Sequence, residues 1–204
     1  NVEKLAHTYS RCSNITGSPV CGPNVTNMCR AYSDCANLTG SPVCGNKVYN
    51  MYAAYTECVN LTGAAIIGPS IKNNGMSMAY INCQNLTSAK IYTENLYGYV
   101  SSALGYALLY ATFTNCNNIN SISFYHENTV SALEAGSEVI LKCATGNPSV
   151  TVHLECPCDC ATDVLNNFDK QFSNLSMITV NANYSHTYVT SNYITPNGVS
   201  VNLI

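Results

Sequence analysis

The side chains best suited to chemistry lie close together in the sequence: His153, Cys156, Cys158 and Cys160. Thiolates and an imidazole are ligands that zinc prefers. These cysteines stand at alternate positions, however, and lack the Cys-x-x-Cys turn that directs two sulfurs at one metal. We therefore expect structural packing or a local disulfide rather than a metal centre, with these four residues as the metal candidates, and we predict no cofactor.

No other group of reactive side chains indicates catalysis. The remaining histidines, His7, His126 and His186, are isolated, and the carboxylates form no recognisable triad or general acid–base pair. No glycine-rich loop that could hold a phosphate is present. We predict that the protein is not an enzyme, and a metal-dependent enzyme built on residues 156–160 is the least favoured hypothesis.

Composition excludes two further classes of protein. The 204 residues include 8 Lys or Arg and 11 Asp or Glu, which gives a net charge of −3 and a charged fraction of 9%, against about 25% in ordinary domains. So few cations cannot neutralise a nucleic-acid backbone, and no apolar stretch reaches the length of a membrane span. We expect neither nucleic-acid binding nor membrane insertion, while 47% hydrophobic residues provide for a core.

An internal repeat organises the first part of the chain. The run Thr-Gly-Ser-Pro-Val-Cys-Gly at 16–22 recurs at 39–45, and further copies begin at Cys58, Cys83 and Cys116. An aromatic residue stands three positions before each repeated cysteine: Tyr9, Tyr32, Tyr55, Tyr80 and Phe113 precede Cys12, Cys35, Cys58, Cys83 and Cys116. Because one short unit cannot bury its apolar side alone, the copies must stack, with like residues forming ladders.

The spacing inside a unit predicts its local structure. Steps of three and four residues place Met28, Tyr32, Cys35 and Leu38 on one side of a short helix or a helical turn. The Gly-Ser-Pro run at 40–42 ends that helix, and we expect Val43 to point inward from a short strand. If these strands pair in parallel, adjacent coils lie about 4.8 Å apart.

The patterns Val-Thr-Asn-Met at 25–28 and Ala-Tyr-x-x-Cys-x-Asn-Leu-Thr at 31–39 closely resemble BspA-like leucine-rich repeats. The resemblance covers about residues 1–128. It implies a solenoid of short helices and short parallel strands, with about five coils in 1–129. It also implies a surface role, because such repeats belong to adhesins of bacteria and some protozoa and occur in proteins encoded by gut phages. Since residue 1 falls inside a repeat, we expect further coils before it.

The repeat loosens in two places. The spacing of 23 residues grows to 33 between Cys83 and Cys116, where an insertion near 92–112 is rich in tyrosine. Insertions in solenoids often carry recognition, so the predicted binding residues are Tyr92, Tyr97, Tyr99 and Tyr106; the alternative is an enlarged helix that packs inward. For 130–204 we predict either degenerate repeats or a small β-rich cap.

The repeated cysteines and the repeated asparagines each have a structural interpretation besides a chemical one. In-register ladder residues point the same way, whereas a disulfide needs opposed Cβ vectors, so we expect the repeated cysteines to be free thiols. Sequons for N-glycosylation occur at Asn14, Asn24, Asn37, Asn60, Asn85, Asn174 and Asn183. Four of them belong to the repeat consensus, which we interpret as hydrogen bonding between coils.

The repeat and the absence of a catalytic group together predict a non-catalytic adhesion or recognition module. We expect an extracellular protein, on a cell surface or a phage virion, that binds a host surface protein or a glycan through a solenoid face. The alternative is a structural component of a fibre, filament or virion, present as a homo-oligomer or in a larger assembly.

Overall fold

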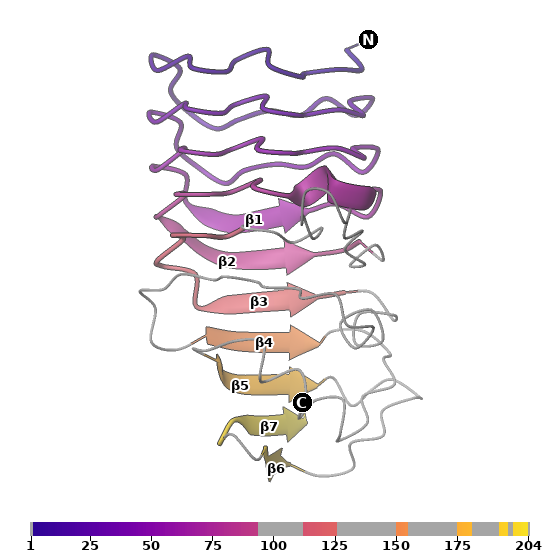
Figure 1. Ribbon diagram of the computed structural model, residues 1–204, viewed down its shortest axis with the longest axis vertical. Helices are drawn as coiled ribbons and strands as arrows, with labels where there is room; N and C mark the ends of the chain where they lie inside the picture. The colour runs from indigo at the N-terminus through magenta and orange to yellow at the C-terminus, as the bar shows by residue number, and fades with distance from the viewer. Residues whose placement is uncertain are drawn as a thin grey trace, which may run out of the picture.

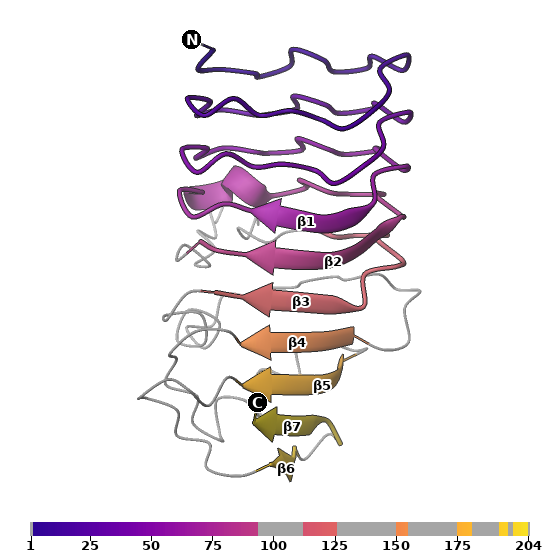
Figure 2. The same cartoon turned by 180° about the vertical axis from the view of Figure 1, so that it is seen from behind.

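A computed structural model shows the chain as a stack of coils whose strands lie one below another (Figures 1 and 2). It describes residues 2–93, 112–125, 150–154, 175–180, 192–195 and 198–203. The first coils, at the N-terminal end, have extended walls without regular strands, and the sheet begins below them (Figure 1).

One sheet runs through the rest of the stack in the order β1-β2-β3-β4-β5-β7-β6. Its strands are β1 (Gly63–Ile67), β2 (Leu86–Ile91), β3 (Ser121–Phe124), β4 (Val150–Leu154), β5 (Leu175–Val180), β6 (Tyr193–Ile194) and β7 (Ser200–Leu203). All pairs are parallel except β6 with β7. Sequential parallel strands are what a solenoid-like stack predicts, so this part of the expectation is confirmed.

Proline decides where the sheet begins. Pro19 and Pro42 occupy the repeat position that Ala65 holds in β1. Proline has no backbone N–H to give to a strand ladder, and these first coils are joined by isolated parallel bridges such as Gly17 with Leu38. Once alanine replaces proline, five residues of β1 pair with β2.

Of the short helix or helical turn that its spacing predicts, segment 28–38 contains no regular helix. Arg30 and Asp34 adopt left-handed backbone conformations, with φ of 51° and 61°, and the segment is a series of turns. Every second backbone N–H in this segment donates to the following coil. Met28 donates to the Asn50 carbonyl (2.7 Å), and Tyr32 donates to the Ala54 carbonyl (2.8 Å). An α-helix would use these donors internally. The only helix among the described residues is the 3₁₀ turn η1 (Asn73–Met76).

The aromatic ladder is confirmed. Consecutive rings of Tyr9, Tyr32, Tyr55, Tyr80 and Phe113 stack with centroids 5.1 to 5.7 Å apart and planes within 13° of parallel. The buried hydroxyl of Tyr55 donates to the Val43 carbonyl (2.7 Å) and accepts from the Val43 N–H (3.3 Å). Tyrosine therefore supplies hydrogen bonds to an extended segment that has no strand beside it.

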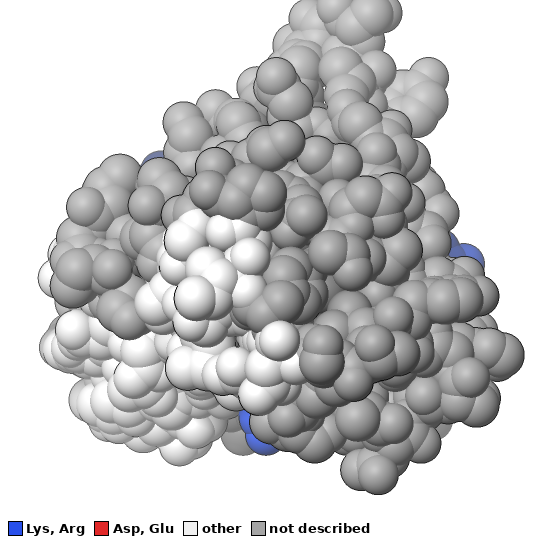
Figure 3. Space-filling model, turned by 90° about the horizontal axis from the view of Figure 1, so that it is seen from below, with Lys and Arg blue, Asp and Glu red and all other residues white. Residues whose placement is uncertain are grey.

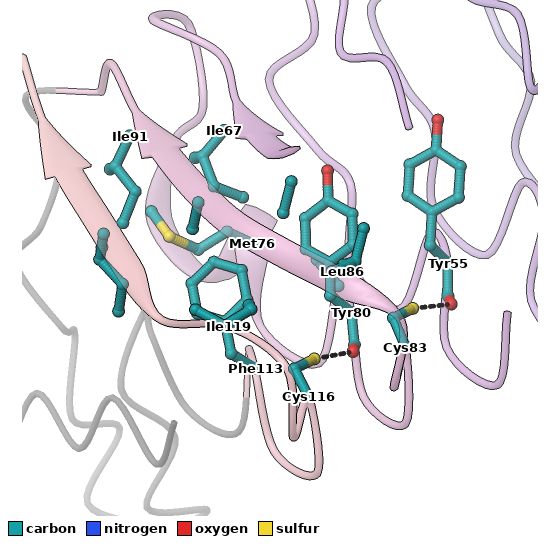
Figure 4. Packing of buried hydrophobic residues seen from close by; sticks show 14 of the residues in the cluster. Tyr55, Ile67, Met76, Tyr80, Cys83, Leu86, Ile91, Phe113, Cys116 and Ile119 are labelled. Atoms are coloured by element: carbon teal, nitrogen blue, oxygen red, sulfur yellow. Dashed lines mark hydrogen bonds between the residues drawn. The ribbon is translucent and has the colours of Figure 1, made fainter. Parts of the chain in front are cut away.

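The cysteine ladder is also confirmed, and its members are free thiols. The sulfurs of Cys35, Cys58, Cys83 and Cys116 each donate to the carbonyl of the aromatic residue one coil earlier. Figure 4 shows two of these contacts, Cys83 Sγ to the Tyr55 oxygen at 3.0 Å and Cys116 Sγ to the Tyr80 oxygen at 2.9 Å. Burial raises the pKa of Cys58 to about 12 and that of Cys83 well above its usual range. These thiols pack as small apolar groups that also donate a weak hydrogen bond.

The expected inward direction of Val43 is wrong. Val43 is half-buried and the equivalent Val20 is 68% exposed, whereas Pro42 is buried and Cys44 packs against the core. Because side chains alternate along an extended segment, the prolines and cysteines on either side of each valine face the interior. In the sheet the same inward position is held by Ala65, Ala89, Ile122, Val152, Ile178 and Val201, all buried and in register.

The proposed division at 129/130 falls between β3 and β4, which pair in parallel within one sheet. The described strands of 130–204 thus extend the stack, and β6 closes it in the antiparallel direction. The insertion predicted near 92–112 lies mostly outside the described residues.

Candidate recognition surface

The outer face of the sheet, named here the outer rows, is built by strand alternation. In β3 and β4 the burial pattern alternates, so that Ile122 and Val152 point inward and the residues beside them point outward. Parallel register aligns these outward residues into two rows across the strands, which Figure 2 shows stacked one below another. Row A contains Ala64, Ser88, Ser121, Thr151, Met177 and Ser200, and row B contains Ile66, Lys90, Ser123, His153, Thr179 and Asn202. Thr179 is buried, and the other residues of the two rows are half-buried or exposed.

Two contacts between side chains on neighbouring strands hold residues of row B in place. His153 Nδ1 lies 2.6 Å from Thr179 Oγ1 on the next strand. Asn202 Nδ2 lies 3.2 Å from the sulfur of Met177 in row A. Such contacts between neighbouring strands hold the polar side chains in fixed positions, which favours recognition because less rotamer freedom is lost on binding.

The hydroxyl groups in the middle of the outer rows remain available. Ser121, Ser123 and Thr151 are half-buried, and their side chains make no hydrogen bond to another residue in the described part of the chain. A hydroxyl donates one hydrogen bond and accepts up to two. The centre of this face can therefore form several hydrogen bonds with a partner without breaking any of its own.

The predicted tyrosine site is described at one residue. Tyr92 directly follows β2, is half-buried, and stacks on Tyr125 with ring centroids 4.5 Å apart. Tyr125 follows β3 and is 36% exposed, so the pair lies at the carboxyl ends of two neighbouring strands. The other predicted binding residues, Tyr97, Tyr99 and Tyr106, lie outside the described residues.

The predicted metal candidates are likewise described at one residue. His153 lies in β4 and its ring nitrogen contacts Thr179, while Cys156, Cys158 and Cys160 fall outside the described residues. Within the described ranges, no three His, Cys, Asp or Glu side chains gather as a metal site would require.

Four further cysteines, like Cys58 and Cys83, are poorly suited to nucleophilic catalysis. Burial raises the pKa of the Cys21, Cys29 and Cys35 thiols and raises that of Cys44 to about 12. A reactive cysteine needs the opposite shift, because the thiolate is the nucleophile.

Two of the four repeat sequons, those at Asn37 and Asn60, take part in contacts between coils. The side-chain amide of Asn37 donates to the Ser13 carbonyl (2.7 Å), and that of Asn60 donates to the Ala36 carbonyl (2.9 Å). Each contact reaches back one coil, as the interpretation of these asparagines as ladder residues requires.

The described residues on the face seen in Figure 3 carry little charge. In the view of Figure 3, the described residues are uncharged apart from a few Lys or Arg side chains. The described part of the chain contains no apolar helix of membrane-spanning length.

The outer rows are the residues that sequence analysis missed as a site. Their signal is present in the alternation of Ser121, Ile122, Ser123 and Phe124, which has the period of a strand with one buried face. The alternation identifies an outward side, but only strand register shows that these residues meet those of distant segments.

Comparison of the chain with protein-family models, curated proteins and solved structures finds no match.

Proposed function

We propose that the protein is a non-catalytic recognition module that binds a partner through the outer rows of its sheet. The observation that carries the proposal is the central group of hydroxyls at Ser121, Ser123 and Thr151, which are presented in register and are not engaged by described side chains. A rigid surface with unused donors and acceptors binds with a small loss of conformational entropy.

The scaffold behind this face supports the same role. The tyrosine hydroxyls and cysteine thiols of the ladders are directed at backbone carbonyls inside the stack, so they act in stability. The resemblance of the repeat to BspA-like leucine-rich repeats agrees with this proposal, because those repeats belong to surface adhesins. The place of action is then extracellular, on a cell surface or a virion, and the partner is a host surface protein or a glycan.

Binding of the purified chain to glycan arrays, protein arrays and intact cells tests the proposal. Ser123→Lys places a long cation in the middle of the outer rows, and Thr8→Lys places the same cation on an exposed turn. Saturable binding that Ser123→Lys weakens by at least about tenfold, with Thr8→Lys unchanged, supports recognition by the outer rows. Absence of binding on all three supports would refute it.

A structural role in a fibre or virion is the second candidate. It is favoured by Ile194, which is 70% exposed on the short strand β6 at the edge of the sheet. This side chain could form an apolar contact with another subunit. Solution mass distinguishes the two: recognition by an isolated module is compatible with a monomer, whereas an obligate structural component assembles, and Ile194→Asp then disperses the assembly.

A further inference from the structure

The chemistry of the outer rows selects one class of partner. Resting on the proposed recognition role, we propose that the face formed by β2 to β5 binds an uncharged, extended polysaccharide whose chain lies along the rows, across the strands.

Charge is the first argument. Among the outer-row residues, Lys90 is the only permanently charged side chain, and no carboxylate is present. A nucleic acid or an acidic polysaccharide would require several cations. The remaining polar groups are hydroxyls, an imidazole and an amide, which complement a ligand made of neutral hydroxyl groups, since each hydroxyl can donate and accept.

The distribution of apolar side chains is the second argument. The core of a protein–protein interface is rich in aromatic and large apolar anchors. The outer rows contain only two large apolar residues, Ile66 at one end and Met177 toward the other, with small or polar side chains between them. This centre offers no anchor for a protein partner.

Geometry is the third argument. Neighbouring strands lie about 4.8 Å apart and the two rows are separated by two residues, roughly 6.6 Å. Ser121 and Thr151 are therefore adjacent in row A, as Ser123 and His153 are in row B. An extended polysaccharide repeats its hydroxyls at every ring, so a chain along the rows can form hydrogen bonds at successive strands. The four strands β2 to β5 provide a face about 14 Å long.

The buried side of the strands holds the hydroxyl groups of rows A and B in fixed positions. Ile122 and Val152 are fully buried beneath the serine and threonine positions, and the strands are hydrogen-bonded on both edges. The hydroxyls thus meet the ligand from a preorganised surface, in contrast to a loop that would have to be ordered on binding.

The test uses the full 204-residue chain with insoluble cellulose, chitin and mannan, and with soluble oligosaccharides of the same sugars. The triple variant Ser121→Val, Ser123→Val and Thr151→Val removes three hydroxyls and retains residues that favour strands. The matched control, Thr8→Val with Thr39→Val, removes two exposed hydroxyls that lie outside rows A and B. We expect retention on at least one neutral polysaccharide, weakened by about tenfold or more in the triple variant and unchanged in the control.

A second measurement needs no variant. Titration of the wild-type chain with the soluble oligosaccharide is expected to shift the backbone amide resonances of β3 and β4 and to leave those of residues 28–38 unchanged. Shifts confined to other segments would overturn the proposal.

Failure of this inference differs from failure of the recognition role. Binding to proteins but to none of the neutral polysaccharides overturns the polysaccharide assignment and leaves recognition in place. Polysaccharide binding that the triple variant retains in full overturns the assignment to the outer rows. Absence of binding to any sugar, protein or cell overturns both.

Discussion

Replacing Tyr55 by phenylalanine isolates the contribution of one ladder hydroxyl to stability. The ring would remain stacked between Tyr32 and Tyr80, at centroid distances of 5.5 and 5.4 Å. Only the hydroxyl is lost, and with it the two hydrogen bonds to the Val43 backbone, at 2.7 and 3.3 Å. Because no strand pairs with that segment, Val43 keeps an unsatisfied carbonyl and N–H in a partly buried site.

The expected cost follows from these two bonds. A hydrogen bond contributes about 0.5–1.5 kcal/mol net, so Tyr55→Phe should lower the free energy of unfolding by about 2 kcal/mol. The chain contains its own comparison: Phe113 has no hydroxyl, and the residue that it would serve, Lys90, lies in β2 with strands on both sides. There the strand ladder replaces the tyrosine.

Tyr9→Phe is the matched control. Tyr9 stacks on Tyr32 in the same way, and its hydroxyl bonds to no other residue in the described ranges. Denaturant unfolding followed by circular dichroism measures both variants. A loss below about 0.3 kcal/mol for Tyr55→Phe, or an equal loss for Tyr9→Phe, would show that the hydroxyl does not support the extended wall.

Three further predictions concern backbone packing, pH and redox state. Gly75→Ala should lower the free energy of unfolding by about 2–3 kcal/mol, since the new Cβ would meet the Tyr49 backbone oxygen. The control Gly22→Ala, whose Cβ would lie 3.6 Å from its nearest neighbour, should cost under about 1 kcal/mol. Equal melting temperatures of the two variants would contradict this. Burial raises the thiol pKa values of Cys44 and Cys58 to about 12, so the unfolded state loses these protons at lower pH than the folded state. The stability present below pH 9 should therefore fall progressively toward pH 12 in denaturant titrations. A stability that does not change over this range would be inconsistent with buried thiols. Intact mass should be the same with and without reductant for fragment 2–93, and a mass difference of several bridged pairs would contradict the free-thiol ladder.

The repeat made much of the core predictable. Tyr55, Cys58 and Leu61 are fully buried, as their ladder positions predict, because a side chain repeated at one coil position meets its own copy in the next coil. The type of local structure was not predictable from the same spacing. Residues at steps of three and four lie on one side both of a helix and of successive turns, and only the left-handed conformations at Arg30 and Asp34 distinguish them.

The candidate site was less predictable than the core. The sequence indicates its aromatic and metal candidates by residue type, and of those the described structure places Tyr92 at the end of β2 and His153 in row B. The serine and threonine positions of the outer rows carry no comparable signal, since isolated hydroxyls occur throughout the chain.

By itself, the sequence determined that similar units stack, that aromatic rings and thiols form ladders, and that charge is scarce along the stack. A repeated pattern is sufficient for this, because each position interacts mainly with its own copies. The tertiary structure decided where the sheet begins and which outward residues become neighbours. Proline at 42 withholds a donor and alanine at 65 supplies one, while segments of unequal length bring Ser121, Thr151 and Met177 into a single row. Strand register is a property of paired backbones, so these neighbours exist only once the coils have stacked.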